Sequence, residues 1–312
     1  PSFTSSSPAP GHMPLRAWNP APGRAATAGD GSGQLSSSAT DRSALGLCAA
    51  SGALLAALLR RRSTRLQRHA WGDDVVYHSA SVLSNVEAAE GLRLITVEAP
   101  EEVVKPFAKA GQYVMAKPAA DAKPSFYSIS SPFGGSMGSK MEFLIKLSES
   151  NAWMTGTKSG DALQLSPAMG RGFSIDGEAW KAADVSQVGI FASGSGIAPL
   201  RAAIESGALA GKVCRLYYGA RSEAGLAYAD RFDAWRKSGV EVVPVLSQGG
   251  DSWGGRQGYI QDAFKQDEER GEGFVLSAKH GALICGQKEM VEAVRQVYSQ
   301  LGVPEERTLL NF

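Results

Sequence analysis

The stretch Val188–Leu200, which reads VGIFASGSGIAPL, decides the fold of this chain. Its first five residues are apolar, as in a buried strand of a parallel sheet. Gly194, Ser195 and Gly196 form a predicted tight turn, and the residues after them have a helical period with Pro199 in the first turn. A strand, a glycine turn and a helix in this order predict the first unit of a doubly wound α/β sheet.

Downstream of this stretch, strand patterns and helix patterns alternate. Helices are predicted at Ala224–Lys237, whose apolar face is Leu226, Tyr228, Phe232 and Trp235, and at Lys288–Leu301. We therefore expect an α/β doubly wound parallel-sheet domain over residues 181–312. Its further strands are predicted at Val213–Tyr218, Val240–Leu246 and Ala282–Cys285.

Upstream, residues 71–180 carry a different pattern, in which short β-branched and aromatic runs alternate with turn residues. Six runs at this spacing are typical of an all-β barrel or sandwich, and we expect a six-stranded antiparallel Greek-key barrel. The predicted strands are Asp74–Leu83, Leu92–Glu98, Gln112–Ala116, Ser125–Ser130, Met141–Leu147 and Ala162–Ser166.

Residues 1–70 have the composition of a targeting leader. They are rich in Ser, Ala, Gly and Pro, and carry eight Arg, no Lys and two acids. An apolar run of 16 residues, 44–59, precedes five arginines and is short of the roughly 20 residues of a membrane span. The pattern predicts a plastid transit peptide of the multi-part kind. A mitochondrial address and a membrane anchor are the alternatives.

Composition excludes several classes for the rest of the chain. The 312 residues carry a net charge of +1, and residues 1–70 contribute +6, which leaves −5 for residues 71–312. An acidic globular part argues against nucleic-acid binding. Three scattered cysteines and four isolated histidines predict neither a disulfide framework nor a metal site.

Candidate nucleotide-binding residues lie at the ends of the predicted parallel strands. The turn Gly194–Gly196, with Ile197 and Pro199 in the helix start, suits a pyrophosphate, because glycines permit close approach and the helix terminus favours negative charge. Arg221 ends the second strand, where it suits a ribose 2′-phosphate, and Tyr228 follows as a candidate against an adenine. The alternatives are a plain strand–helix turn, a solvated Arg and a core Tyr.

Two further candidates concern the redox partners of such a nucleotide. Cys285 and Gly286 end the fourth strand, opposite Gly194, so Cys285 is a candidate beside a nicotinamide. In the barrel, Tyr127 is a candidate to stack on a planar ring and Ser128 to donate to a ring nitrogen. Ordinary core packing is the alternative for both Cys285 and Tyr127.

Together these motifs resemble the ferredoxin–NADP reductase superfamily over residues 73–312. Several segments are more specifically similar to its plant "fruit protein" branch. The segments that carry the resemblance are G-x-G-x-x-P at 194–199, Leu216–Arg221 (LYYGAR), Pro244–Gln248 (PVLSQ), Asp251-Ser252-Trp253, Gly258-Tyr259, Cys285-Gly286-Gln287-Lys288 with Met290, and Leu310-Asn311-Phe312.

The resemblance implies FAD in the barrel and NADP, with NAD as the second choice, on the α/β domain. The family motif Arg-x-Tyr-Ser falls on Ser125–Ser128, so Tyr127 and Ser128 match the flavin-contacting positions and Ser125 replaces the phosphate-gripping Arg. Lys123 is a candidate substitute as a point charge. Phe312 is a candidate to cover the flavin on the side that faces the nicotinamide.

The function expected on these grounds is an NAD(P)H-dependent flavin oxidoreductase of the plastid. Hydride would pass from NAD(P)H to the flavin, and electrons would pass on to an unidentified acceptor, of which ferredoxin is one candidate. The alternative is a catalytically silent NAD(P)-binding sensor or assembly subunit with a degenerate flavin site, which Ser125 favours. Membrane association is left open.

Overall fold

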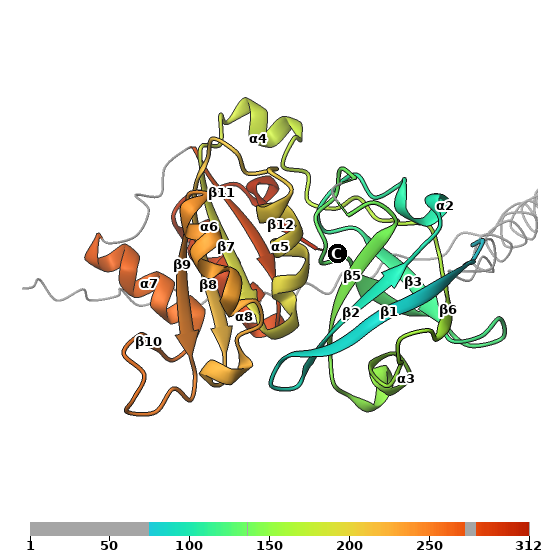
Figure 1. The fold of residues 1–312 in the computed structure, drawn as a ribbon. Helices are drawn as coiled ribbons and strands as arrows, with labels where there is room; N and C mark the ends of the chain where they lie inside the picture. The colour runs from blue at the N-terminus through green and yellow to red at the C-terminus, as the bar shows by residue number, and fades with distance from the viewer. Residues whose placement is uncertain (1–74, 136, 272–278, 312) are drawn as a thin grey trace, which may run out of the picture. The chain divides into compact units, whose positions relative to one another are not determined.

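The computed structural model describes residues 75–135, 137–271 and 279–311 (Figure 1). These residues belong to one compact unit, residues 71–312. The predicted leader, its apolar run 44–59 and the candidate Phe312 lie outside the described residues. Among the described residues, no helix combines the length and the apolar character that crossing a membrane requires.

The first sheet has six antiparallel strands in the order β4-β3-β6-β1-β2-β5, as the sequence predicts. We call these strands the barrel. They are β1 (His78–Ala89), β2 (Leu92–Glu98), β3 (Tyr113–Lys117), β4 (Ser125–Ser128), β5 (Lys140–Lys146) and β6 (Ala162–Leu165), with the short helices α2 (Glu101–Val104) and α3 (Ala152–Thr155) between them.

The barrel closes where the two edge strands meet. Just after β4, the backbone N–H of Ser130 donates to the carbonyl of Glu142 on β5 at 2.8 Å. Strand β1 extends six residues further than predicted, because it pairs with β6 through 78–81 and with β2 through 81–89. Apolar side chains on alternate positions, such as Ile95 and Val97 on β2, are fully buried inside.

The second sheet is parallel, with the strand order β10-β9-β8-β7-β11-β12. Figure 1 shows β7, β8 and β9 side by side as arrows that point the same way. The strands are β7 (Gln187–Ser193), β8 (Val213–Ala220), β9 (Val240–Leu246), β10 (Arg256–Gln257), β11 (His280–Cys285) and β12 (Thr308–Leu310). The helices are α4 (Glu178–Ala182), α5 (Ile197–Glu205), α6 (Phe232–Lys237), α7 (Ile260–Arg270) and α8 (Lys288–Gln300).

Helices cover both faces of this sheet, which confirms the doubly wound prediction. On one face, α5 and α6 bury Leu200 and Trp235 against strand residues such as Leu216. On the other face, α7 and α8 bury Phe264 and Tyr298 in a separate core. Successive strand residues alternate between the two cores, as a pleated strand requires.

The predicted helix over 224–237 is wrong in its first half. The structure has two 3-10 turns, Glu223–Gly225 and Ala229–Arg231, before α6. Tyr228 adopts a left-handed conformation, with φ +61°, and the N–H of Ala227 donates to the hydroxyl of Tyr218 at 3.1 Å. A helix cannot continue through a left-handed residue, so only the last six residues are helical.

Candidate functional site

The turn between β7 and α5 requires glycine at two positions, for a different reason at each. Gly194 has φ +53°, and a methyl group there would have no atom within 4 Å, so one side of the turn is open. A methyl group at Gly196 would overlap the carbonyl of Cys285. The second glycine therefore lets the start of α5 lie directly against the end of β11.

The ends of three parallel strands meet at this turn. The N–H of Gln287, just after β11, donates to Ser193 Oγ at 2.9 Å. From β8, the hydroxyl of Tyr218 donates to the carbonyl of Gly194 at 3.2 Å. The carboxyl edge of a parallel sheet is where such folds bind ligands, so this edge is the candidate nucleotide site.

Not every predicted nucleotide residue has a side chain at the surface of this edge. Ile197 and Pro199 are buried helix residues, so only the backbone near them is open to a ligand. Ser195 is half-buried, and Gly286 packs against Ser193, where a methyl group would overlap its hydroxyl. The backbone rather than the side chains thus forms the candidate cradle.

Cys285 lies at the predicted place, beside Gly196 at the end of β11. Its side chain is buried, and burial raises the pKa of the thiol to about 12. The thiol is therefore neutral near pH 7, and it is a packing group rather than a nucleophile.

Arg221 follows β8 directly, and its side chain is exposed. Its carbonyl accepts from the N–H of Gln248 at 2.8 Å, which fixes the backbone beside β9. The position matches the expectation of a charged side chain at this strand end, and its role toward a 2′-phosphate stays a prediction.

Tyr228 does not face this edge in the way that contact with an adenine requires. Its side chain is 5% exposed, and its ring lies 4.7 Å from the Arg201 guanidinium carbon. The structure therefore has the core Tyr that was the alternative at this position.

Another aromatic residue, at the start of α7, is accessible to solvent, unlike Tyr228. Tyr259 is 61% exposed and is the N-cap of that helix. The next residue, Ile260, packs close to Gly219 at the end of β8. In the sequence, Gly258-Tyr259 stood out only as part of the family resemblance.

A hydrogen bond across 183 residues brings Ser128 to the same edge. Asn311 Nδ2 donates to Ser128 Oγ at 2.8 Å. Asn311 follows β12, whose Leu310 is paired with Ile284, the neighbour of Cys285. The barrel hydroxyl that the motif assigns to a flavin therefore lies beside the strand end that carries Cys285. In the sequence, Asn311 stood out only as part of the resemblance at Leu310-Asn311-Phe312, without a role at the site.

Tyr127, on the same strand as Ser128, points the other way. It is 6% exposed, and its ring lies 6.4 Å from that of Phe143 and 6.2 Å from that of Trp153. Its hydroxyl donates to Asn151 Oδ1 at 3.3 Å, and burial raises its pKa above the ordinary value. Of the two alternatives for Tyr127, the structure has core packing, because strand alternation turns the ring inward.

The two residues considered for the flavin phosphate are less buried than Tyr127. Lys123 is exposed in the turn before β4, and Ser125, at the motif's Arg position, is half-buried. Neither supplies a two-pronged contact to an anion, and the role of Lys123 stays a prediction.

Comparisons with known proteins agree with this geometry. Residues 190–296 match the family described as the oxidoreductase NAD-binding domain. The fruit protein pKIWI502 of Actinidia deliciosa is 33% identical over 267 residues, which are 81% of this chain and 83% of that protein. Ferredoxin–NADP reductase B of Sorangium cellulosum is 33% identical over 118 residues, 36% of this chain and 48% of that protein.

Solved structures share the fold. A ferredoxin NADP⁺ reductase from Neisseria gonorrhoeae, solved with bound FAD and NADP, superposes with a TM-score of 0.61 at 19% identity. The match covers 76% of this chain and 99% of that one. With the close relation to the kiwifruit protein, the barrel and the nucleotide edge place this chain in the ferredoxin–NADP reductase family of NAD(P)H-dependent flavin oxidoreductases.

Proposed function

We propose that this chain takes hydride from NADPH onto a flavin bound beside Ser128 and passes the electrons to an acceptor. The observation that carries the proposal is the Asn311–Ser128 hydrogen bond of 2.8 Å. It joins the flavin-motif strand of the barrel to the end of β12, which is paired with β11, the strand that ends at Cys285. A flavin ring held at Ser128 would then lie at the edge where the turn Gly194–Gly196 suits a dinucleotide.

The groups around Ser128 fit a flavin. Ser128 Oγ accepts from Asn311, so its own O–H is left to donate to a ring nitrogen. Asn311 Oδ1 is buried and has no hydrogen-bond partner among the described residues. Leaving such an acceptor unpaired costs about 1–3 kcal/mol, and a ring N–H would pair with it.

In the proposal, the protein aligns the reactants and excludes water, while the flavin supplies the ability to accept two electrons and release them singly. The backbone N–H groups at Gly194–Gly196 hold the pyrophosphate. The neutral Cys285 thiol packs beside the nicotinamide without adding a charge. Arg221 contacts the 2′-phosphate, which is the reason for proposing NADPH over NADH.

A second candidate function is a nucleotide-binding subunit without turnover. Two observations favour it, namely Ser125 at the motif's Arg position and the burial of the Tyr127 ring among Phe143 and Trp153. Both weaken the flavin side, and neither affects the nucleotide turn.

One experiment separates the two functions. The purified protein is incubated with FAD, passed over a desalting column and titrated anaerobically with NADPH or NADH while the flavin absorbance is followed. We expect retained flavin that NADPH bleaches at lower concentration than NADH. Loss of the flavin on the column, with NADPH affinity retained, would support the second candidate instead.

We also propose a plastid location, which the composition of residues 1–70 supports. Import of a fusion of residues 1–70 with a fluorescent protein into isolated plastids, but not mitochondria, is the expected result. We propose a one-electron carrier as the acceptor. If that carrier is ferredoxin, the protein should reduce added ferredoxin when NADPH is supplied.

A further inference from the structure

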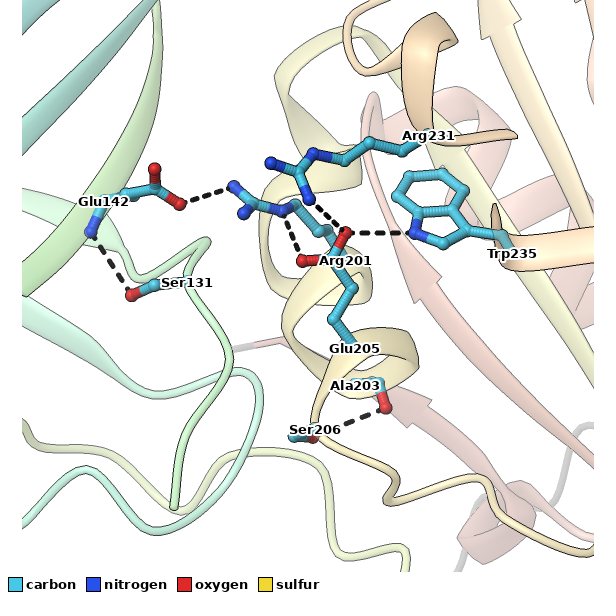
Figure 2. Close-up of polar contacts among 8 residues, drawn as sticks. All are labelled: Ser131, Glu142, Arg201, Ala203, Glu205, Ser206, Arg231 and Trp235. Atoms are coloured by element: carbon cyan, nitrogen blue, oxygen red, sulfur yellow. Dashed lines mark hydrogen bonds and ion pairs between the residues drawn. The ribbon is translucent and has the colours of Figure 1, made fainter. Parts of the chain in front are cut away.

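A buried ionic cluster joins the barrel to helix α5 (Figure 2). Arg201 on α5 has a side chain 2% exposed, and its Nη1 lies 2.8 Å from Oε2 of Glu142 on β5. Its Nε donates to Glu205 Oε2 at 2.9 Å. Burial alone would lower the pKa of Arg201, but Tyr228 and the two carboxylates outweigh it and keep the pKa above its ordinary value. The sequence motifs did not point to this cluster.

Glu205 fixes the direction of the Arg201 side chain. Besides Arg201, the Glu205 carboxylate accepts from Trp235 Nε1 at 3.0 Å and from Arg231 Nη1 at 3.3 Å (Figure 2). A carboxylate with three donors from its own side of the molecule leaves little rotational freedom to the guanidinium. The Arg201 fork is therefore oriented before it meets Glu142.

Glu142 is tied in turn to the segment that follows Ser128. Its carbonyl accepts from the N–H of Ser130 at 2.8 Å, and its own N–H donates to Ser131 Oγ at 3.2 Å. One residue thus holds the flavin-motif segment through its backbone and α5 through its side chain. Because α5 begins directly after Gly196, the chain of contacts runs from one candidate half-site to the other.

Stability does not explain why charges are used here. A buried ion pair contributes about as much as well-packed apolar residues of the same volume, because desolvation offsets the attraction. What an ion pair adds is a required distance between two groups. An apolar contact between the barrel and α5 would tolerate sliding, whereas a buried charge that moves away from its counter-charge is left uncompensated, which is strongly unfavourable.

We propose that Glu142 and Arg201 are positioning residues that hold the segment Ser128–Ser131 at a fixed spacing from α5, and so set the rate of hydride transfer. The inference rests on the proposed function. If the pair sets the approach of the two reactants, breaking it slows the transfer and leaves nucleotide affinity alone. Misplacement by about 1 Å can cost on the order of a hundredfold in rate.

The test compares Glu142→Gln, which keeps the shape and the backbone contacts, with Asp233→Asn at the exposed Arg236–Asp233 pair of α6. Hydride transfer is measured by anaerobic stopped flow, NADPH affinity by titration, and exchange of the Ser130 amide hydrogen without cofactors. For Glu142→Gln we expect a rate about ten- to a hundredfold lower, an affinity within about twofold and faster Ser130 exchange. For Asp233→Asn we expect no change.

A further variant, Arg201→Lys, keeps the charge and loses the fork, and its rate should lie between wild type and Glu142→Gln. An unchanged rate with unchanged Ser130 exchange in Glu142→Gln would overturn the inference. So would faster exchange across all of residues 75–311, because that is general loosening. A wild type that retains flavin but does not reduce it overturns the proposed function alone, and the exchange measurement still decides the spacing.

Discussion

The two halves of the candidate site differ in what their sequences require. At the nucleotide turn, backbone geometry requires glycine at two positions: Gly194 has a positive φ, and Gly196 lies in contact with Cys285. On the barrel strand, the motif residue Tyr127 fills the core, where it packs among Phe143 and Trp153. In the nucleotide half, backbone geometry explains the motif residues, whereas in the barrel half side-chain packing explains them.

This difference shows why a motif must be tested against burial. A glycine that cradles a phosphate does so through the backbone, so its presence constrains function directly. An aromatic motif residue satisfies the barrel core whether or not a flavin is bound. The nucleotide half is therefore the better-supported half, and the flavin half depends on Ser128 and Asn311.

The largest effect is expected for Tyr127, and it tests whether the barrel motif residue serves the core. Tyr127→Ala should lower the free energy of unfolding by about 3–5 kcal/mol, because it removes a large buried aromatic. Urea unfolding measures it. The control is Phe126→Ala on the same strand, where the side chain is 55% exposed and the expected loss is about 1 kcal/mol. Flavin lost from Tyr127→Ala at wild-type stability would contradict the packing role.

On the nucleotide side, Gly196→Ala should act through the backbone. The added methyl would push α5 away from Cys285, and we expect unfolding to become about 1–3 kcal/mol easier, with NADPH affinity reduced. Gly254→Ala is the control, because a methyl there has no atom within 4 Å. Equal stability and equal NADPH affinity in the two variants would show that the turn does not require glycine at position 196.

The third effect concerns nucleotide choice. One charge-assisted contact exclusive to the 2′-phosphate, about 1.5–3 kcal/mol, should give wild type a ten- to hundredfold preference for NADPH. Arg221→Ala should remove most of this preference by weakening NADPH while NADH is nearly unchanged. Titrations of both nucleotides measure it, with Arg236→Ala as the control. Equal affinities in wild type would show that Arg221 has no such role.

A smaller effect is expected for the contact that joins the two halves. Asn311→Ala and Ser128→Ala each remove one partner of the same hydrogen bond, so their costs should not add. A double-mutant cycle in urea should give a coupling of about 0.5–1.5 kcal/mol. Strictly additive costs would mean that the contact contributes nothing in solution.

The smallest effect is expected for Cys285. With a pKa of about 12, on the order of one thiol in ten thousand is ionised at pH 8. Iodoacetamide should therefore label Cys285, followed by peptide mass spectrometry, far more slowly in the native protein than in the urea-unfolded one. Because the pKa is raised in the folded state, this thiol costs stability only as the pH rises above about 9, where the unfolded chain loses its proton first. Rapid labelling of Cys285 itself at pH 8 would contradict its burial.

The parts of the fold that were predicted are those with a continuous signal. The apolar and alternating runs predicted all six barrel strands and four of the six parallel strands. Strands β10 and β12 were not predicted, because two and three residues are too short to show a pattern. Helix α7 was missed because its buried face includes Asp267, which is ion-paired to Arg256 and so interrupts the apolar pattern. In the site, the strand ends were predicted, but Asn311 and Glu142 were not, because their partners lie 183 and 59 residues away in the chain.

The edges of the parallel sheet bear on how this protein behaves in concentrated solution. An exposed edge strand offers unpaired backbone groups to a second chain and can seed aggregation, the more so the longer and flatter it is. Here the two outer strands, β10 and β12, have only two and three residues, and β10 carries Arg256. Strands β10 and β12 themselves therefore offer an intruding strand only two and three residues to pair with. Lengthening β10 with β-branched residues would turn this edge into a template for intermolecular pairing.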